Sequence, residues 1–109
     1  MLVQNQPDFL NVPYKIIELQ KGFVCKLDPD DYEKLKKYHW YACKSFHCFY
    51  VLTTFRRNGR KVFVRMHRHI MHCKTGLVVH HINHNTMDNR RKNLMILTEE
   101  EHIQYFSKR

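Results

Sequence analysis

Three histidines in the last third of the chain have the residue types and spacing needed for metal-assisted chemistry. His80 and His81 are adjacent, and His102 follows 21 residues later. Neighbouring residues on a strand point to opposite faces, so His80 and His81 are expected to do different jobs. One can share a cation with His102, and the other is left to act as a base, because an imidazole titrates near neutrality. A cation beside a general base is the equipment for metal-assisted hydrolysis of a phosphodiester.

The segments around these histidines predict the elements that would hold them. Leu77–Val79 has the composition of a strand, and residues 83–92 form a polar loop in which Asn and Asp supply turn chemistry. A second apolar run covers residues 94–97. Thr98 and, three positions later, Glu101 then form a capping box that marks a helix start. The predicted order is strand, loop, strand and helix, with histidines at the end of the first strand and the start of the helix.

This layout resembles the HNH nuclease motif on its ββα-metal fold, in the subgroup found in phage and homing-type endonucleases. His81, Asn93 and His102 fall on the H, N and H that name the motif, at spacings of 12 and 9 residues. Asp88-Asn89-Arg90 matches a recurrent loop element of the same subgroup. The resemblance covers about residues 15–106 and implies an α+β fold with a nuclease activity.

The resemblance also implies a role for each motif residue. His81 maps to the general base, and His80 and His102 map to the metal ligands. Asn93 maps to the asparagine that braces the loop against the base. Arg90, Arg91 and Lys92 lie beside the site, and any of them could hold the scissile phosphate; Arg90 ranks first because it falls within the shared loop element.

The implied cofactor is one divalent metal ion: Mn²⁺, Ni²⁺, Mg²⁺ or Zn²⁺. Many members of the subgroup carry Asp where this chain has His80, and Gly where it has His84. Histidine in place of Asp at position 80 keeps a metal ligand but replaces a hard carboxylate oxygen by a softer imidazole nitrogen. Imidazole suits Zn²⁺, Ni²⁺ and Mn²⁺ better than Mg²⁺, which prefers oxygen.

The net charge of +9 is unevenly distributed along the chain. Residues 34–87 contain eleven Lys and Arg but no Asp or Glu, whereas the acidic residues lie before and after this window. Plain solubility charge would mix the two signs. The window therefore predicts a basic face, and the expected partner is a polyphosphate, here double-stranded DNA.

A basic hairpin is predicted within this window. Asn58-Gly59 is a strong turn signal between strands expected at about residues 48–55 and 61–66. A two-stranded ribbon with basic residues can enter a DNA groove, although arginines also protect edge strands from aggregation. The residues predicted to contact DNA are Arg56, Arg57, Arg60, Lys61, Arg65, Arg68, Arg91 and Lys92.

The rest of the chain predicts a single small α+β domain. Two strands at residues 14–19 and 22–26 precede a helix that Asp28 would cap and that would run to about Lys37. A further strand is expected at residues 38–44. A short helix is expected at residues 67–73, in which His67 could approach the active site, although a structural histidine is the favoured interpretation. We divide the chain into an N-terminal arm (1–13), a basic β-rich DNA-contacting portion (14–76) and the HNH motif (77–109). The expected core comprises Tyr32, Leu35, Trp40, Phe63, Ile70, Ile96 and Phe106.

Composition excludes several protein classes. No apolar run approaches the length needed to span a bilayer, and the first residues lack a signal-peptide pattern, so a cytoplasmic protein without membrane contact is expected. Cys43 and Cys48 could form a zinc half-site only with a second half, such as Cys73 and a histidine. The simpler interpretation is buried or idle thiols. No heptad pattern or apolar patch decides between a monomer and a homodimer.

Three functions follow from these patterns. The leading hypothesis is a metal-dependent DNA endonuclease. The second is a DNA-binding domain whose metal site is structural or has decayed. The third is a small zinc protein that binds a protein partner, which the acid-free basic face disfavours.

Overall fold

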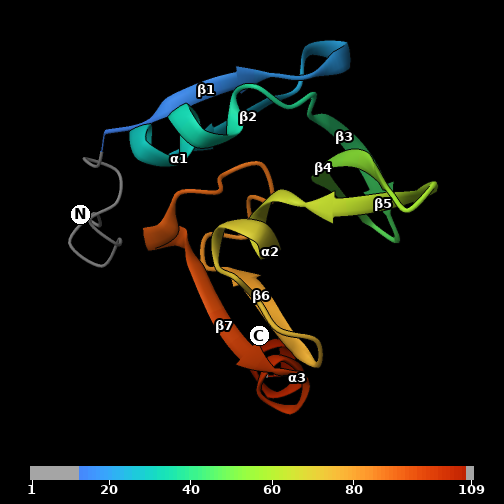
Figure 1. The fold of residues 1–109 in the computed structure, drawn as a ribbon. Coiled ribbons are helices and arrows are strands. Elements are labelled where there is room, and N and C mark those ends of the chain that lie inside the picture. The colour runs from blue at the N-terminus through green and yellow to red at the C-terminus, as the bar shows by residue number, and fades with distance from the viewer. Residues whose placement is uncertain (1–12, 108–109) are drawn as a thin grey trace.

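A computed structural model describes the backbone of residues 13–107 and the side chains up to residue 104. Three small antiparallel sheets and a few short helices make up this α+β protein (Figure 1). The arm predicted for residues 1–13 lies outside the described residues except for Pro13. No helix of the described chain is long and apolar enough to cross a membrane.

The N-terminal sheet is a hairpin of β1 (Lys15–Glu18) and β2 (Val24–Leu27), followed by α1 (Pro29–Leu35). Pro at the first helical position and acids in the first turn start α1 as predicted. The capping role predicted for Asp28 is wrong, because its side chain makes no cap bond and instead accepts a hydrogen bond of 3.0 Å from the Arg91 backbone N–H. This carboxylate ties the start of α1 to a segment 63 residues later.

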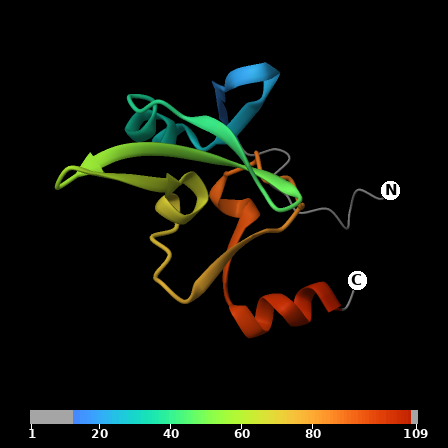
Figure 2. The same cartoon turned by 90° about the vertical axis from the view of Figure 1, so that its right-hand side faces the viewer.

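The central sheet is a meander of β3 (Tyr41–Ser45), β4 (Cys48–Arg57) and β5 (Arg60–Arg65). Asn58 and Gly59 both have positive φ, 54° and 77°, which is the backbone of the tight turn that matches strand twist. Figure 2 shows the β4–β5 hairpin projecting from the body of the molecule. The predicted hairpin is confirmed.

The C-terminal part has the predicted order of strand, loop, strand and helix. β6 (Leu77–His81) pairs with β7 (Leu94–Thr98), and α3 (Glu99–Ser107) follows directly. The capping box forms: the Thr98 N–H donates to Glu101 Oε1 at 2.9 Å, and the Glu101 N–H donates to Thr98 Oγ1 at 3.0 Å. The short helix α2 (Met66–Ile70) connects β5 to this unit.

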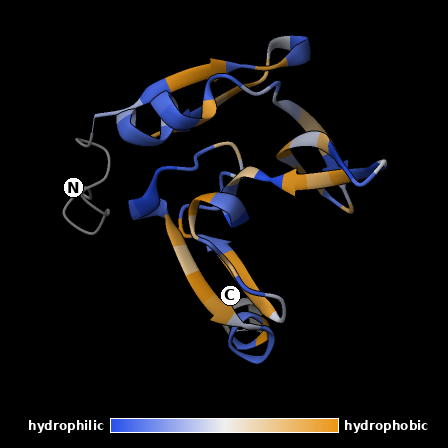
Figure 3. Cartoon of the chain, viewed as in Figure 1, coloured by the Kyte–Doolittle hydropathy of each residue, from blue (hydrophilic) through white to orange (hydrophobic). Residues whose placement is uncertain are grey.

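One core joins the three sheets. Its fully buried members are Cys25, Leu27, Leu35, Trp40, Val51, Met66, Ile70, Val79 and Leu94. In Figure 3 the largely apolar strands β6 and β7 are connected by a largely hydrophilic loop.

Two of the predicted core residues are exposed. Phe63 is 61% exposed on the open side of the central sheet, where the Lys61 ammonium lies 5.7 Å from its ring. Ile96 is 38% exposed on a sheet of only two strands. The side chain of Phe106 lies outside the described residues.

The loop between β6 and β7 is bonded to the N-terminal hairpin. The Lys26 N–H donates to the Met87 carbonyl at 2.9 Å, and the Asn89 N–H donates to the Lys26 carbonyl at 2.8 Å. These bonds form a parallel bridge between Lys26 and Asp88. The β1–β2 hairpin is therefore hydrogen-bonded to the loop that carries the predicted motif.

Candidate active site

A cleft of about 440 Å³ opens where β4, α2, β6 and α3 meet. Three of its walls carry histidine rings. The lining residues are Cys48, Tyr50, Arg65, His67, Arg68, Val78, Val79, His80, His81, His84, Thr86 and His102.

His80 and His102 come together at one side of this cleft. His80 is 3% exposed near the end of β6, and its ring centre lies 5.4 Å from that of His102 on α3. Two imidazoles that bind one ion at about 2.1 Å have ring centres about 5–7 Å apart, so the pair fits a shared divalent cation. The His84 ring lies 5.5 Å from that of His80, nearly perpendicular to it.

The protein supplies few further candidate ligands. Within the described part of the chain, no group of three or more His, Cys, Asp or Glu residues could hold a metal ion. The zinc half-site considered for Cys43, Cys48 and Cys73 therefore does not form there, and these thiols are free. A cation held by the His80–His102 pair would take its remaining ligands from water or from a bound substrate.

His81 faces other neighbours than His80, as alternation along β6 requires. It is 5% exposed, and its Nε2 lies 2.8 Å from Asn89 Oδ1. An amide oxygen only accepts, so Nε2 carries the proton and donates, and Nδ1 is left as the acceptor. Burial lowers the pKa of His81, an effect that the hydrogen bond to Asn89 and the charge of Asp88 only partly offset. The imidazole is thus neutral near pH 7 and able to take a proton.

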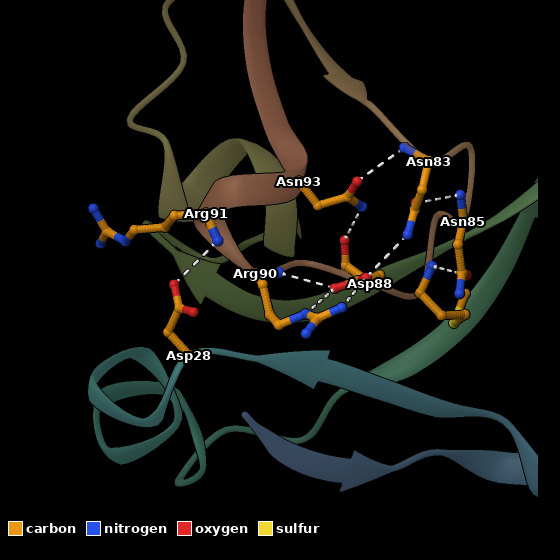
Figure 4. A network of polar contacts seen from close by, with 8 residues as sticks. Asp28, Asn83, Asn85, Asp88, Arg90, Arg91 and Asn93 are labelled. Carbon is orange, nitrogen blue, oxygen red and sulfur yellow. Dashed lines mark hydrogen bonds and ion pairs between the residues drawn. The ribbon is translucent and has the colours of Figure 1, made fainter. Parts of the chain in front are cut away.

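A buried amide holds the loop between the two strands (Figure 4). Asn93, fully buried, accepts a bond of 2.9 Å from the Asn83 N–H and donates through Nδ2 to the Asp88 carbonyl at 2.8 Å. The Asn83 side chain donates in turn to Asp88 Oδ2 at 3.1 Å. These bonds tie Asn93 to the loop at Asn83 and at Asp88.

Comparison with known families gives one match. Residues 64–104 match the model of a family described as HNH endonuclease. This segment of the chain belongs to the HNH endonuclease family. Comparisons with curated proteins and with solved structures gave no match. The matched residues run from the end of β5 into α3 and include every histidine of the cleft.

Arg90 of the HNH loop does not reach this cleft. It is 2% exposed, and its Nε and Nη2 donate to the two carboxylate oxygens of Asp88 at 2.9 and 2.8 Å. Burial alone would raise the pKa of Asp88, but hydrogen bonds and charge from Arg90, with a bond from Asn83, lower it overall. The phosphate contact expected of Arg90 is inconsistent with this enclosure. Its guanidinium instead donates hydrogen bonds to Asp88 within the loop.

Two other arginines predicted to contact DNA also have structural partners. Arg91 donates through Nε and Nη2 to both oxygens of the buried Asp31, each at 2.9 Å, while half of its side chain stays exposed. Arg68 donates to the carbonyls of Leu77 and Lys74 at 2.8 and 3.1 Å. Both arginines hold elements together around the HNH unit.

The remaining residues predicted to contact DNA are more accessible. Arg65 lines the cleft, with its guanidinium 5.5 Å from the Tyr50 ring centre. The others are exposed, at the hairpin tip and beside the loop: Arg56, Arg57, Arg60, Lys61 and Lys92.

Sequence reasoning treated His67 as structural and did not single out Tyr50. The His67 ring lies 5.0 Å from that of His81 and 5.4 Å from that of Tyr50, and both residues line the cleft. No spacing rule finds this contact, because α2 and β4 reach the HNH strand only through tertiary packing. The only sequence signal is the position of His67 shortly before the motif.

Proposed function

We propose that this protein is a metal-dependent endonuclease that hydrolyses phosphodiester bonds of double-stranded DNA. The observation that carries the proposal is the arrangement along β6. The His80–His102 pair lies on one side, while His81 on the other is kept neutral by burial and held by Asn89 in the tautomer that leaves Nδ1 as the acceptor. Both sites open into one cleft.

His81 acts as the general base. Its Nδ1 takes a proton from a water molecule, and the water oxygen attacks the phosphorus in line with the departing 3′ oxygen. The bond from Nε2 to Asn89 keeps the ring in the tautomer this step needs. The departing 3′ oxygen takes a proton from solvent water, so the products are a 5′ phosphate and a 3′ hydroxyl.

His80 and His102 would hold one divalent ion. When bound, such an ion supplies Lewis-acid stabilisation of the charge that develops on the phosphate and on the leaving oxygen. Because both imidazole ligands are neutral, they do not reduce the positive charge of the ion. Mn²⁺ and Ni²⁺ are therefore expected to support cleavage better than Mg²⁺, and Zn²⁺ to bind tightly.

DNA binding is assigned to the basic hairpin and the residues beside the cleft. The hairpin tip carries Arg56, Arg57, Arg60 and Lys61, all exposed, and its strands continue to Arg65 and Tyr50 at the cleft. Phosphates bound along the hairpin could thus continue toward the His80–His102 pair. This continuity of positive charge supports a polyanionic substrate.

A DNA-binding domain with a structural or decayed metal site is the second candidate. Among the described residues no group of three protein ligands forms around the His80–His102 pair, which also suits a site that binds a cation weakly or does no chemistry.

A nicking assay separates the two functions. Supercoiled plasmid is incubated with the protein and Mg²⁺, Mn²⁺, Ni²⁺ or Zn²⁺, beside His81→Ala and the matched surface variant His69→Ala. Nicking that requires metal, disappears in His81→Ala and persists in His69→Ala supports the nuclease. Binding without nicking in any metal supports the second candidate.

A further inference from the structure

His67 is a buried imidazole with one ring nitrogen, Nδ1, that the fold does not pair. The side chain is 5% exposed, and its Nδ1 is enclosed without a hydrogen-bond partner among the described residues. Buried polar atoms are nearly always paired, and leaving one unpaired costs stability. The ring nevertheless lines the cleft and lies against the base His81.

We propose that His67 is a second catalytic histidine, which accepts a hydrogen bond from the water molecule that His81 deprotonates. This inference rests on the proposed nuclease function. The ring centres of His67 and His81 are 5.0 Å apart. Hydrogen bonds to water span about 2.8 Å, so one water molecule can reach a nitrogen of each ring.

The two imidazoles divide the work on that water molecule. One proton is transferred to His81 Nδ1, and the other is held by His67 and stays on oxygen. A lone pair of the oxygen forms the new bond to phosphorus as the bond to the 3′ oxygen breaks. His67 ends the step unchanged, having fixed the direction in which the lone pair points.

The surroundings of His67 keep it neutral and a poor base. Burial is the main cause that lowers its pKa to about 3, with further lowering from His81, Arg65 and Arg68. The transferred proton therefore goes to His81. Tyr50 closes the other face of the ring at 5.4 Å and contributes no charge at neutral pH.

Packing alone does not explain a histidine at this position. A phenylalanine would make the same ring contacts with Tyr50 and His81 and would leave no unpaired nitrogen. Replacing a buried unpaired polar group by an apolar one of similar shape is neutral or stabilising. The imidazole is thus retained at a cost to the fold, which is expected of a group that serves the reaction.

The test compares His67→Phe with His69→Phe, an exposed histidine on the same helix. We expect His67→Phe to melt at the same or a higher temperature than the parent protein and to bind plasmid DNA equally well. Its single-turnover cleavage rate with Mn²⁺ should fall on the order of a hundredfold, because misplacing a reacting group costs about that much. His69→Phe should leave the melting temperature, the DNA binding and the cleavage rate unchanged.

Two results would overturn the inference. Full cleavage by His67→Phe would show that only the shape of the ring matters. A lower melting temperature in His67→Phe would show that the nitrogens support the fold. If His67→Phe cleaves fully while His81→Ala does not, the nuclease stands and this inference fails. If the parent protein cleaves in no metal, the proposed function fails, and this inference falls with it.

Discussion

The loop between β6 and β7 and the hairpin of β4 and β5 are both polar, but they use their polar groups in opposite ways. In the loop, Asp88, Asn89, Arg90 and Asn93 are each at most 2% exposed, and their side chains bond to one another or to the site. The basic residues of the hairpin tip are exposed, and Arg56 Nη1 donates to a carbonyl of the adjacent turn, that of Gly59 at 3.2 Å.

The difference follows from the tasks we propose for the two regions. A general base must hold one tautomer and one direction, and a buried hydrogen-bonded network gives that rigidity. Phosphate binding needs charge and reach, and a hydrated arginine keeps both when it has no fixed partner. The loop should therefore be sensitive to single substitutions, whereas the hairpin should respond only to the loss of several charges.

The largest effect is expected where the loop meets the chemistry. His81→Ala should lose at least about a hundredfold in cleavage rate, because that is the usual minimum cost of removing a general base. DNA affinity and metal affinity should change little, since His81 faces Asn89 and not the His80–His102 pair. His80→Ala should instead weaken metal binding, measured by calorimetry. Equal losses of metal affinity in both variants would show that the two roles are reversed.

Breaking the Asp88–Arg90 pair should have the largest effect on stability. Asp88→Ala leaves the guanidinium of Arg90 buried without its carboxylate, which typically costs about 3–5 kcal/mol in the free energy of unfolding. Arg56→Ser on the exposed hairpin should stay within about 0.5 kcal/mol of the parent. Urea denaturation measures both. A similar small cost for the two variants would remove the contrast between loop and hairpin.

The sequence predicted the elements better than it predicted the use of individual side chains. The strand–loop–strand–helix order, the capping box at Thr98 and the Asn58-Gly59 turn were all predictable, because each depends on neighbours in sequence. The burial of Arg90 was not predictable. Its carboxylate partner Asp88 is close in sequence, but the β1–β2 hairpin that encloses the loop lies about 60 residues earlier.

The same limit applies to the site. Alternation along β6 predicted that His80 and His81 would face different neighbours. Alternation could not predict the neighbours of His81, because Asn89 lies on the β6–β7 loop and His67 on α2, and only the tertiary fold brings them to β6. Phe63 was wrongly placed in the core because an apolar residue on a strand does not reveal which face of the sheet stays open.

Removing charge from the hairpin should change binding and leave the fold intact. If the basic window makes on the order of five phosphate contacts, log K should fall with log salt at a slope of about −4 to −5. Changing Arg56, Arg57, Arg60 and Lys61 together to Ser should flatten that slope without lowering the urea midpoint. Fluorescence anisotropy with a duplex at several salt concentrations measures it. An unchanged slope would place the DNA on another face of the molecule.

A smaller and more selective effect is expected at the metal pair. His80→Asp exchanges an imidazole for the oxygen ligand that Mg²⁺ prefers, so the ratio of cleavage rates in Mg²⁺ and Mn²⁺ should rise. Calorimetry should show the same change in binding preference without DNA. His80 is not a ligand if the preference is untouched or if activity disappears in every metal while binding is unchanged.

The smallest expected difference between the site and the β4–β5 hairpin is in how each contributes to the loss of stability in acid. The pKa of His67 is lowered to about 3, and that of His81 is also lowered, chiefly by burial, whereas both would titrate near 6.5 in the unfolded chain. Between pH 6.5 and 3 the unfolded chain therefore binds more protons, and the free energy of unfolding must fall as the pH falls. Asp88 adds to this only below about pH 4, because its folded pKa lies under its ordinary value.

The hairpin from Leu52 to Arg65 contains no Asp, Glu or His and contributes nothing in this range. Urea midpoints at pH 7 and pH 4.5 should thus differ for the parent protein and differ less for His67→Phe, which has lost one of the two imidazoles whose pKa burial lowers. The four-residue hairpin variant should show the full parental difference. If His67→Phe also shows it, then His67 is not held neutral by the fold, and the division of labour between the two histidines has no electrostatic basis.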